Sequence, residues 1–432
     1  MYRKAIEELK KWKYSPHRKP LIIQGARQVG KTWLMKEFGR QEYKDTAYVN
    51  FDENSMMQNL FSSDINVTRI ISGIEIYIGK KIDPVNTLII FDEVQEVPRA
   101  LSSLKYFYEE APQYQIVCAG SLLGIALHKG TSFPVGKVEF LRIYPMSFSE
   151  FLIAEGYKTY ADLISDQNFE MMDVFSAEFT DLLKRYYFVG GMPESVQRYV
   201  EEHDLISVRK IQEQILKDYE QDFSKHVPYN VVPRIRAVWN SLPSQLAKEN
   251  RKFVYGLVRE GARAKDYETA IMWLSDCGLV HKVSRVGTPR LPLDAYEDLK
   301  AFKLYSVDVG LMSCMSGLRQ KTILDGNSLF TEFKGSLTEQ YVLQQLKCIS
   351  DLNIYYYTND RGSCEIDFVV DNGELVIPVE VKAEENLKAK SLRTYREKYN
   401  PSLSVRISMS GYRRQDSFVN LPLYAVEAFG SL

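Results

Sequence analysis

The chain contains 432 residues, of which 45% are hydrophobic and 26% are charged, and its formal net charge is −1. A chain of this length exceeds what one hydrophobic core supports, so we expect two to four domains, and the composition excludes a disordered protein. The near-zero net charge excludes a molecule-wide attraction to nucleic acid or membranes, so any such contact has to be local.

The cysteines and the N-terminal segment indicate the compartment. Five cysteines are scattered without a C-x-x-C pair, which argues against a disulfide framework or a zinc knuckle and favours a reducing compartment. The opening MYRKAIEELKKWK is a basic amphipathic stretch that lacks the apolar region of a secretory signal. No apolar run approaches the roughly 20 residues of a membrane helix. We therefore expect a cytoplasmic protein without a membrane partner.

The first motif joins a short strand to a helix near the N-terminus. Residues 21–23 (LII) are apolar, and residues 32–38 have the pattern of a helix. The segment between them matches G-x-x-x-x-G-K-[ST] in the strand–loop–helix context that makes this sequence a phosphate-binding loop. The matching residues are Gly25, Ala26, Arg27, Gln28, Val29, Gly30, Lys31 and Thr32.

These residue types fit a bound nucleoside triphosphate such as ATP. Glycines let backbone N–H groups, and the positive end of the following helix, face the phosphates. We expect Lys31 to reach the β- and γ-phosphates and the Thr32 hydroxyl to coordinate Mg²⁺. The alternative is a chance glycine-rich turn, and the flanking strand and helix argue against it.

A second motif supplies the groups that hydrolysis requires. In residues 88–93 (LIIFDE) an apolar strand runs into Asp92, which can hold Mg²⁺, and Glu93, which can polarise the attacking water. Residues 47–51 (AYVNF) form a further expected strand between the two motifs, as in P-loop ATPases that carry an extra strand. A strand ending in solvated acids is the alternative, and the preceding phosphate-binding loop disfavours it.

Several polar residues are candidates to complete this site. Ser121 follows the expected strand 115–119 and is either a γ-phosphate sensor or a turn-forming serine. Gln95 can help to position water. An arginine from a neighbouring subunit often completes such sites, and Arg99 and Arg142 are both candidates in a homo-oligomer.

The order of the motifs resembles a family of bacterial and archaeal AAA-type ATPases with accessory C-terminal domains. The segments GARQVGKTWL, FDEVQEVP, AGSLLG, YPMSFSEF and YFVGGMPE carry this resemblance. It implies an ATPase core followed by a small helical lid, and it makes Pro193 a candidate nucleotide contact. The local alternative for Pro193 is a helix-terminating turn. Relatives often have Gly-Arg where this chain has Gly136-Lys137, so Lys137 would be a weaker, point-charge substitute.

The middle of the chain has the order of a winged helix. Residues 234–247, a short stretch near 253–259 and residues 265–275 are expected helices, and 278–283 and 302–305 are expected strands. Residues 231–317 contain thirteen Lys or Arg against nine Asp or Glu, a net charge of +4. This basic patch is modest, so DNA contact and a purely structural packing role both stay open.

The C-terminal region resembles the restriction-endonuclease-like, or PD-(D/E)xK, superfamily. A helix carrying Glu339, a strand at 353–358 and the hairpin CEIDFVVDNGELVIPVEVK at 364–382 precede a helix near 389–399 and a strand near 405–409. Because residues i and i+2 of a strand share a face, Glu380 and Lys382 project together, and Asp367 can lie across from them.

These residues suggest a second metal site. We expect Asp367 and Glu380 to hold Mg²⁺ or Mn²⁺, Lys382 to stabilise the transition state or orient water, and Glu339 to complete the ligand set. The alternative is the polar outer face of an amphipathic hairpin with ordinary Glu–Lys pairing. A nuclease-like fold that has lost turnover and only docks DNA or a protein partner is also consistent with the sequence.

The sequence thus predicts an α/β protein with four domains. These are a P-loop AAA-type ATPase core at 1–155, a helical lid at 156–228, a winged-helix-like domain at 229–318 and a restriction-endonuclease-like domain at 325–432. We expect ATP hydrolysis with Mg²⁺, coupled to DNA and to the nuclease-like domain. The alternative is a nucleotide-controlled signalling or scaffold switch whose C-terminal domain docks a partner without catalysis.

Overall fold

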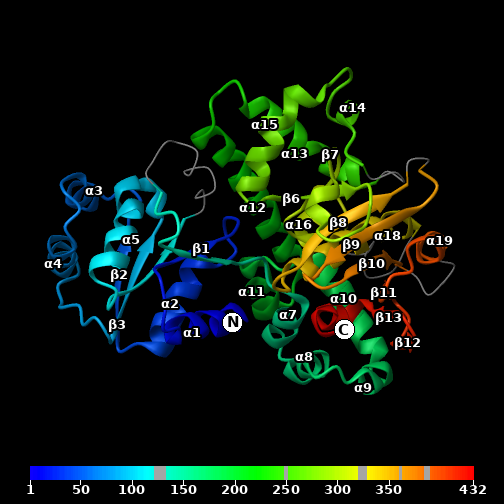
Figure 1. The fold of residues 1–432 in the computed structure, drawn as a ribbon, viewed down its shortest axis with the longest axis horizontal. Coiled ribbons are helices and arrows are strands. Elements are labelled where there is room, and N and C mark those ends of the chain that lie inside the picture. The colour runs from blue at the N-terminus through cyan, green and yellow to red at the C-terminus, as the bar shows by residue number, and fades with distance from the viewer. Residues whose placement is uncertain (121–132, 248–251, 320–327, 360–361, 384–389) are drawn as a thin grey trace. The chain divides into compact units, whose positions relative to one another are not determined.

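The computed structural model describes residues 1–120, 133–247, 252–319, 328–359, 362–383 and 390–432 (Figure 1). The chain divides into two compact units. The P-loop unit comprises residues 3–144 and 276–278, and the C-terminal unit comprises residues 1–2, 145–275 and 279–432. The expected lid and endonuclease-like region lie in the C-terminal unit, as does the winged-helix-like region apart from residues 276–278.

The P-loop unit is built on a five-stranded parallel sheet with the order β2-β3-β4-β1-β5. The strands are β1 (Leu21–Gln24), β2 (Asp45–Asn50), β3 (Thr87–Asp92), β4 (Gln115–Ala119) and β5 (Glu139–Arg142). The expected strand at 47–51 is therefore present as β2, at the edge of the sheet beside β3. Strand β4 lies between β3 and β1, so it separates the strands that lead into the two nucleotide motifs.

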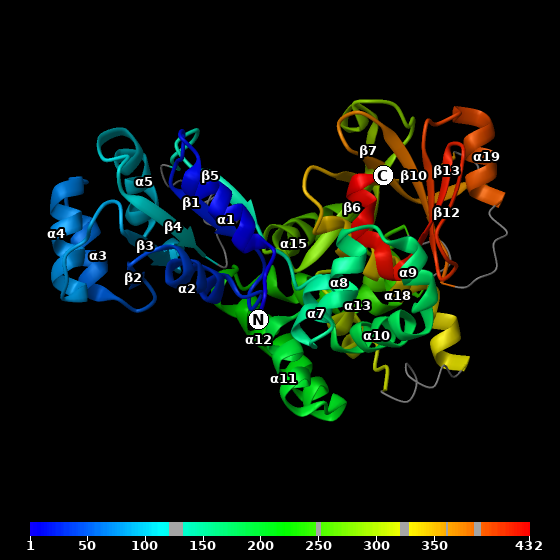
Figure 2. The same cartoon turned by 90° about the horizontal axis from the view of Figure 1, so that it is seen from below.

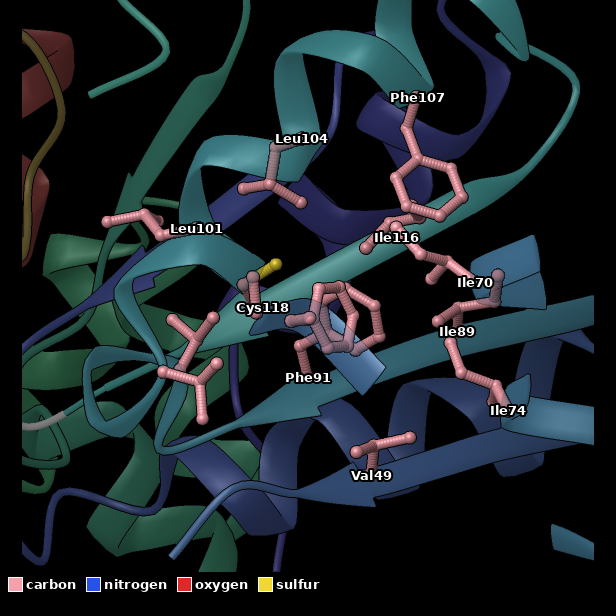
Figure 3. Packing of buried hydrophobic residues seen from close by; sticks show 14 of the residues in the cluster. Val49, Ile70, Ile74, Ile89, Phe91, Leu101, Leu104, Phe107, Ile116 and Cys118 are labelled. Carbon is pink, nitrogen blue, oxygen red and sulfur yellow. The ribbon is translucent and has the colours of Figure 1, made fainter. Parts of the chain in front are cut away.

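Helices cover the sheet of the P-loop unit. They are α1 (Ala5–Tyr14), α2 (Lys31–Glu42), α3 (Ser55–Ser62), α4 (Val67–Ile78) and α5 (Pro98–Glu110), with a short 3-10 turn η1 (Val94–Glu96). Figure 3 shows Val49, Ile89, Phe91 and Ile116 of the sheet packed with apolar side chains of α4 and α5. Every residue of β3 is buried, because a parallel strand in the middle of a sheet is covered on both faces.

The C-terminal unit contains many helices around a second sheet. Its first helices are α7 (Phe148–Ala154), α8 (Lys158–Ser165), α9 (Phe169–Val174), α10 (Ser176–Val189), α11 (Pro193–Glu202) and α12 (Leu205–His226). They are followed by α13 (Val232–Leu246), α14 (Tyr255–Val258), α15 (Ala264–Asp276), α16 (Val309–Met315), α18 (Ser328–Lys347) and α19 (Lys390–Tyr399). The three helices expected between residues 234 and 275 are thus present as α13, α14 and α15.

The second sheet has eight strands in the order β12-β13-β11-β10-β9-β8-β6-β7. They are β6 (Val280–Val286), β7 (Glu297–Ser306), β8 (Asn353–Thr358), β9 (Glu365–Asp371), β10 (Val376–Val381), β11 (Ser404–Ser408), β12 (Arg413–Gln415) and β13 (Phe418–Pro422). Two 3-10 segments, η2 (Leu293–Tyr296) and η3 (Leu423–Ser431), complete the unit. In Figure 2, β6 and β7 lie toward one side of this sheet and β12 and β13 toward the other.

The hairpin expected to belong to a winged helix is part of this same sheet. Strand β6 pairs with β7 in antiparallel fashion and with β8 in parallel, at Arg285–Tyr356 and Val286–Tyr357. Strands β8, β9 and β10 continue the sheet through antiparallel pairs. The winged-helix-like and endonuclease-like regions therefore share a sheet, because backbone pairing crosses the boundary expected between residues 318 and 325.

The GGMPE segment is held by a buried carboxylate within the C-terminal unit. The N–H of Gly191 donates to Oδ2 of Asp308 over 2.6 Å, and Nε2 of Gln344 donates to the same oxygen over 3.0 Å. A Cβ on Gly191 would collide with the backbone of Met146. Pro193 then occupies the first turn of α11. A Cβ on Gly190 would likewise collide with Oδ1 of Asp308, so both glycines of this segment are required for close packing.

No helix in the described ranges combines the length and the apolar character needed to cross a membrane.

Candidate functional site: the phosphate-binding loop and an acidic pocket

The loop between β1 and α2 has a backbone that only glycine permits at two points. A Cβ on Gly25 would lie 2.5 Å from the carbonyl oxygen of Ile143, so no larger residue fits there. Gly30 precedes α2 with φ of 90°, in the left-handed region that favours glycine. Helix α2 begins without a side-chain cap or an acidic residue in its first turn. Its N-terminal N–H groups are therefore suited to an anion.

Lys31 lies across this loop. Its Nζ donates to the carbonyl oxygens of Gly25 (2.9 Å) and Ala26 (2.7 Å), and the side chain is buried. Burial lowers the pKa of Lys31 to about 8, and the nearby carboxylates of Glu93 and Asp92 oppose this shift. An anionic phosphate in the loop would favour the charged ammonium, so the loop and Lys31 fit the triphosphate that the sequence predicts.

Asp92 receives hydrogen bonds from three neighbours. Thr32 Oγ1 donates to its Oδ2 over 2.7 Å, Tyr48 Oη donates to the same oxygen over 2.9 Å, and the N–H of Glu93 donates to Oδ1 over 3.1 Å. The two expected magnesium ligands, Thr32 and Asp92, are thus in direct contact. A hydroxyl and a carboxylate oxygen at hydrogen-bonding distance are the hard oxygen donors that Mg²⁺ prefers.

Tyr48 is a residue of this site that the motifs did not reveal. It comes from the edge strand β2, and Nζ of Lys36 lies 3.9 Å from the centroid of its ring. The strand pattern could have indicated it, since Ala47 and Val49 are buried in the core while Tyr48 points to the opposite face.

Glu93 follows β3 in a left-handed backbone conformation, with φ of 50°. Nε2 of Gln95 donates to its Oε2 over 2.7 Å. The sequence expectation placed Gln95 near the attacking water, and the structure places it on the expected general base itself.

The other residues of the P-loop unit expected to complete the nucleotide site are Arg99, Arg142, Lys137 and Ser121. Arg99 donates from Nε to the carbonyl of Phe61 (2.9 Å) and from Nη2 to that of Ser63 (2.7 Å), so it caps the end of α3. Arg142 is exposed at the end of β5. Lys137 forms an ion pair with Glu109 at 2.9 Å. Ser121 lies outside the described residues.

The expected carboxylates of the C-terminal region line one pocket of about 340 Å³. Its walls are formed by Gly335, Glu339, Glu365, Asp367, Glu380, Val381, Lys382, Ala383 and Ser391. The fold therefore brings the expected side chains of α18, β9 and β10 into one pocket, although α18 is separated from the hairpin in the sequence.

Two of these acids, Asp367 and Glu380, lie at the open end of the β9–β10 hairpin. Asp367 accepts a hydrogen bond from the N–H of Val381 at 2.8 Å. Glu380 is 4% exposed, its Oε1 lies 3.3 Å from Nζ of Lys382, and its Oε2 is buried without a hydrogen-bond partner. Burial raises the pKa of Glu380, and Lys382 opposes that shift. A cation beside Glu380 would compensate the charge that burial disfavours.

The other two acids contact strand β7. Glu365 forms an ion pair with Lys303 at 2.7 Å, and Glu339 accepts a 3.4 Å hydrogen bond from the hydroxyl of Tyr305. Sequence analysis did not single out Lys303 or Tyr305. Across the described part of the chain, no group of three or more His, Cys, Asp or Glu side chains is arranged to hold a metal ion. Glu339, expected to complete the ligand set, is thus in the pocket but not gathered with the other two into such a group.

The basic residues of the middle region are on the surface. Lys252, Arg259, Arg263 and Lys265 are exposed in or near α14 and α15. Arg251, which the sequence placed with them, lies outside the described residues.

Three family models match the chain, and each covers less than half of it. A model described as an AAA domain matches residues 17–152. Two models described as domains of unknown function, DUF8612 and DUF4143, match residues 180–322 and 334–426. The first match covers both nucleotide motifs, and the third covers the acidic pocket apart from its contacts with β7. No curated protein matches the chain.

The solved structures that match the chain have low sequence identity. The Walker-type ATPase of Pyrococcus abyssi is 14% identical, with a TM-score of 0.45, over 72% of this chain and 94% of that one. The Aeropyrum pernix ORC2 protein is 12% identical, with a TM-score of 0.36, over 75% and 94%. The Thermotoga maritima RuvB branch migration motor is 12% identical, with a TM-score of 0.28, over 67% and 90%.

Proposed function

We propose that this chain, whose residues 17–152 match the AAA domain, is a magnesium-dependent ATPase. The observation that carries the proposal is the contact between Thr32 and Asp92 beside the buried Lys31 and the following Glu93. These groups lie at the carboxyl ends of β1 and β3, where ligands bind to parallel α/β sheets.

Each residue has a role that follows from its chemistry. The N–H groups of residues 25–32 and the ammonium of Lys31 would hold the phosphates. Thr32 and Asp92 would hold Mg²⁺, which when bound supplies positive charge to the transferred phosphoryl group. Glu93 would accept a proton from the attacking water, and Gln95 fixes the Glu93 carboxylate. We retain Pro193 as a proposed nucleotide contact, Ser121 as a proposed sensor and Arg142 as the proposed arginine that a second copy supplies.

The test separates nucleotide binding from turnover. Lys31→Ala should strongly weaken nucleotide binding, whereas Glu93→Gln should keep binding and reduce turnover by about 10²- to 10⁴-fold, the usual contribution of a general base. Asp92→Asn should weaken binding only when Mg²⁺ is present. Wild-type protein that retains no adenine nucleotide with Mg²⁺ would contradict the proposal.

A second proposed activity is divalent-cation-dependent action on DNA at the acidic pocket. The observation that favours it is the buried, unpartnered Oε2 of Glu380, in a pocket that Asp367 also lines. Asp367 and Glu380 would hold Mg²⁺ or Mn²⁺, and Glu339 would line the pocket beside them. Lys382 would stabilise charge on a phosphodiester that the exposed basic residues near α14 and α15 help to bind.

This activity has a direct test. Mn²⁺ should support cleavage of duplex or single-stranded DNA, and Asp367→Ala should remove it. If DNA also stimulates ATP hydrolysis, and Asp92→Asn abolishes that stimulated turnover, the two sites are coupled.

The alternative is a nucleotide-controlled signalling or scaffold switch in the cytoplasm, whose C-terminal region only docks a protein or DNA partner. The ion pair between Lys382 and Glu380 favours it, because a lysine can satisfy a buried carboxylate without a metal. ATP hydrolysis that no nucleic acid stimulates, together with no cleavage in Mn²⁺, would support the switch.

A further inference from the structure

Strand β7 contributes to the acidic pocket, although it lies in the region expected to form a winged helix. Lys303 and Tyr305 are two residues apart on β7, so their side chains project from the same face of the strand. Lys303 contacts Glu365, and Tyr305 contacts Glu339. Two of the four pocket carboxylates therefore have a contact on β7.

Lys303 is fixed by its surroundings. Its side chain is 2% exposed, and its Nζ lies 4.8 Å from the centroid of the Tyr356 ring on β8. A buried ammonium is costly unless an opposite charge compensates it, and Glu365 at 2.7 Å is that charge. Because Lys303 and Glu365 form an ion pair, their charges nearly cancel, and the pair adds little net negative potential for a cation in the pocket.

The other two acids have a different environment. Asp367 is oriented by the backbone N–H of Val381, and one oxygen of Glu380 is buried without a partner. A buried polar atom without a hydrogen bond lowers stability unless a ligand satisfies it. The pocket thus has one pair of acids in contact with β7 and a second pair, Asp367 of β9 and Glu380 of β10, at the open end of the β9–β10 hairpin.

We propose that Lys303 and Tyr305 are positioning residues of the pocket, which hold Glu365 and Glu339 and leave Asp367 and Glu380 to bind a single divalent cation. This inference rests on the cation-binding role proposed above for the pocket. It also means that the pocket is not complete within residues 334–426, because β7 belongs to the segment that a separate family model matches.

The cation affinity of charge variants tests this division. Mn²⁺ is titrated without nucleotide and followed by the paramagnetic resonance signal of the free ion, with Asp92→Asn in every protein so that the P-loop does not contribute. One ion should bind, Asp367→Asn should abolish binding, and Glu365→Gln should lower the affinity by about fivefold, because it leaves the charge of Lys303 without its partner.

Removing the charge of Lys303 should leave the negative charge of Glu365 uncompensated in the pocket. Lys303→Met should raise the Mn²⁺ affinity by about fivefold, because the pocket gains one net negative charge, and Lys303→Met with Glu365→Gln should restore the original affinity. Lys282→Met is the matched control. It removes the same charge from an exposed lysine on the same hairpin, whose Nζ lies over the ring of Phe302, and it should leave the affinity unchanged. An unchanged or lower affinity in Lys303→Met would overturn the inference.

Thermal unfolding in a chelator tests the Lys303–Glu365 pair without any cation. Lys303→Met leaves Glu365 without its partner, so adding Glu365→Gln should recover part of the lost melting temperature instead of lowering it further. Additive losses would overturn the role of Lys303. Wild-type protein that binds no Mn²⁺, with non-additive unfolding, would overturn the cation pocket while leaving the Lys303–Glu365 pair established, so the two failures are distinguishable.

Discussion

The hydroxyl of Tyr48 donates a hydrogen bond to Asp92 over 2.9 Å, on the same carboxylate oxygen that Thr32 contacts. Tyr48 lies on β2 and Asp92 at the end of β3, and the two strands pair in parallel from Asp45–Thr87 to Asn50–Asp92. The edge strand therefore fixes the orientation of the carboxylate that would hold magnesium.

Tyr48→Phe should weaken magnesium-dependent nucleotide binding. The ionised Asp92 loses a donor, and hydrogen bonds to charged groups contribute about 1.5–3 kcal/mol, so we expect at least a roughly tenfold rise in the Mg²⁺ concentration needed for half-maximal ATP binding. ATP binding in a chelator should not change. Titration with a fluorescent ATP analogue, with and without Mg²⁺, measures both quantities.

A matched control exists for this variant. Tyr43 is a buried tyrosine of the P-loop unit, and its hydroxyl donates to Oε1 of Gln115 over 2.5 Å, away from Asp92. Tyr43→Phe should leave the Mg²⁺ dependence as in the wild type. An equal effect of both substitutions would show that Tyr48 acts only through general stability.

Nucleotide binding should depend on pH through Lys31. Because burial lowers its pKa to about 8 in the free protein, Lys31 loses its proton well below the ordinary range of lysine. A bound triphosphate favours the ammonium, so ATP affinity measured without magnesium should fall as the pH rises through 8, by up to about tenfold per pH unit above it. Lys31→Ala should have weak, pH-independent affinity over the same range.

The same shift has an opposite consequence for the free protein. The folded state binds fewer protons at Lys31 than the unfolded state between pH 8 and the ordinary lysine pKa of about 10.4, so this group makes folding more favourable as the pH rises through that window. A melting temperature of Lys31→Met that follows the same pH dependence as the wild type would contradict the assignment.

The sequence alone was sufficient to predict those features whose residues are neighbours in the chain. Gly25 to Thr32 and the Asp92–Glu93 pair each form a local pattern, and the alternation in residues 364–382 predicted the hairpin that became β9 and β10. Tyr48, Lys303 and Tyr305 were missed because their partners are 34 or more residues away and only strand pairing brings them together. The alternation in β2 indicates which face Tyr48 occupies, but no local pattern identifies the partner of any of the three residues.

Long-range strand pairing also explains why the β6–β7 hairpin was assigned to a separate winged helix and not to the sheet of the C-terminal region. Its strands were located from their apolar runs, but their junction with β8 depends on parallel backbone pairing, which leaves no mark in a single sequence. Arg99 is a related case. A surface arginine in a sequence can either cap a helix or reach a neighbouring subunit. For Arg99, only its hydrogen bonds to the carbonyls of Phe61 and Ser63 in the structure show that it caps α3.

Gly191→Ala should strongly destabilise the C-terminal unit. A Cβ there would collide with the backbone of Met146. The shift needed to relieve the collision would break the hydrogen bond from the N–H of Gly191 to the buried carboxylate of Asp308. Backbone clashes and broken buried networks are among the changes that cost more than about 3 kcal/mol. Gly256→Ala is the control, because no atom lies within 4 Å of a Cβ at that position, and it should leave the melting temperature nearly unchanged.

Gln95→Ala should reduce turnover without reducing nucleotide affinity. Gln95 holds the Glu93 carboxylate through a 2.7 Å hydrogen bond, and a general base that is free to rotate spends less time aligned with water. We expect kcat to fall by about tenfold, a loss of ~1.4 kcal/mol in the transition state, while KM stays within about twofold. Gln41→Ala removes an equivalent 2.7 Å bond to Glu37 on the exposed side of α2 and should change neither constant. A higher kcat in Gln95→Ala would mean instead that Gln95 restrains Glu93 in an inactive position, since release of the carboxylate would then favour the reaction.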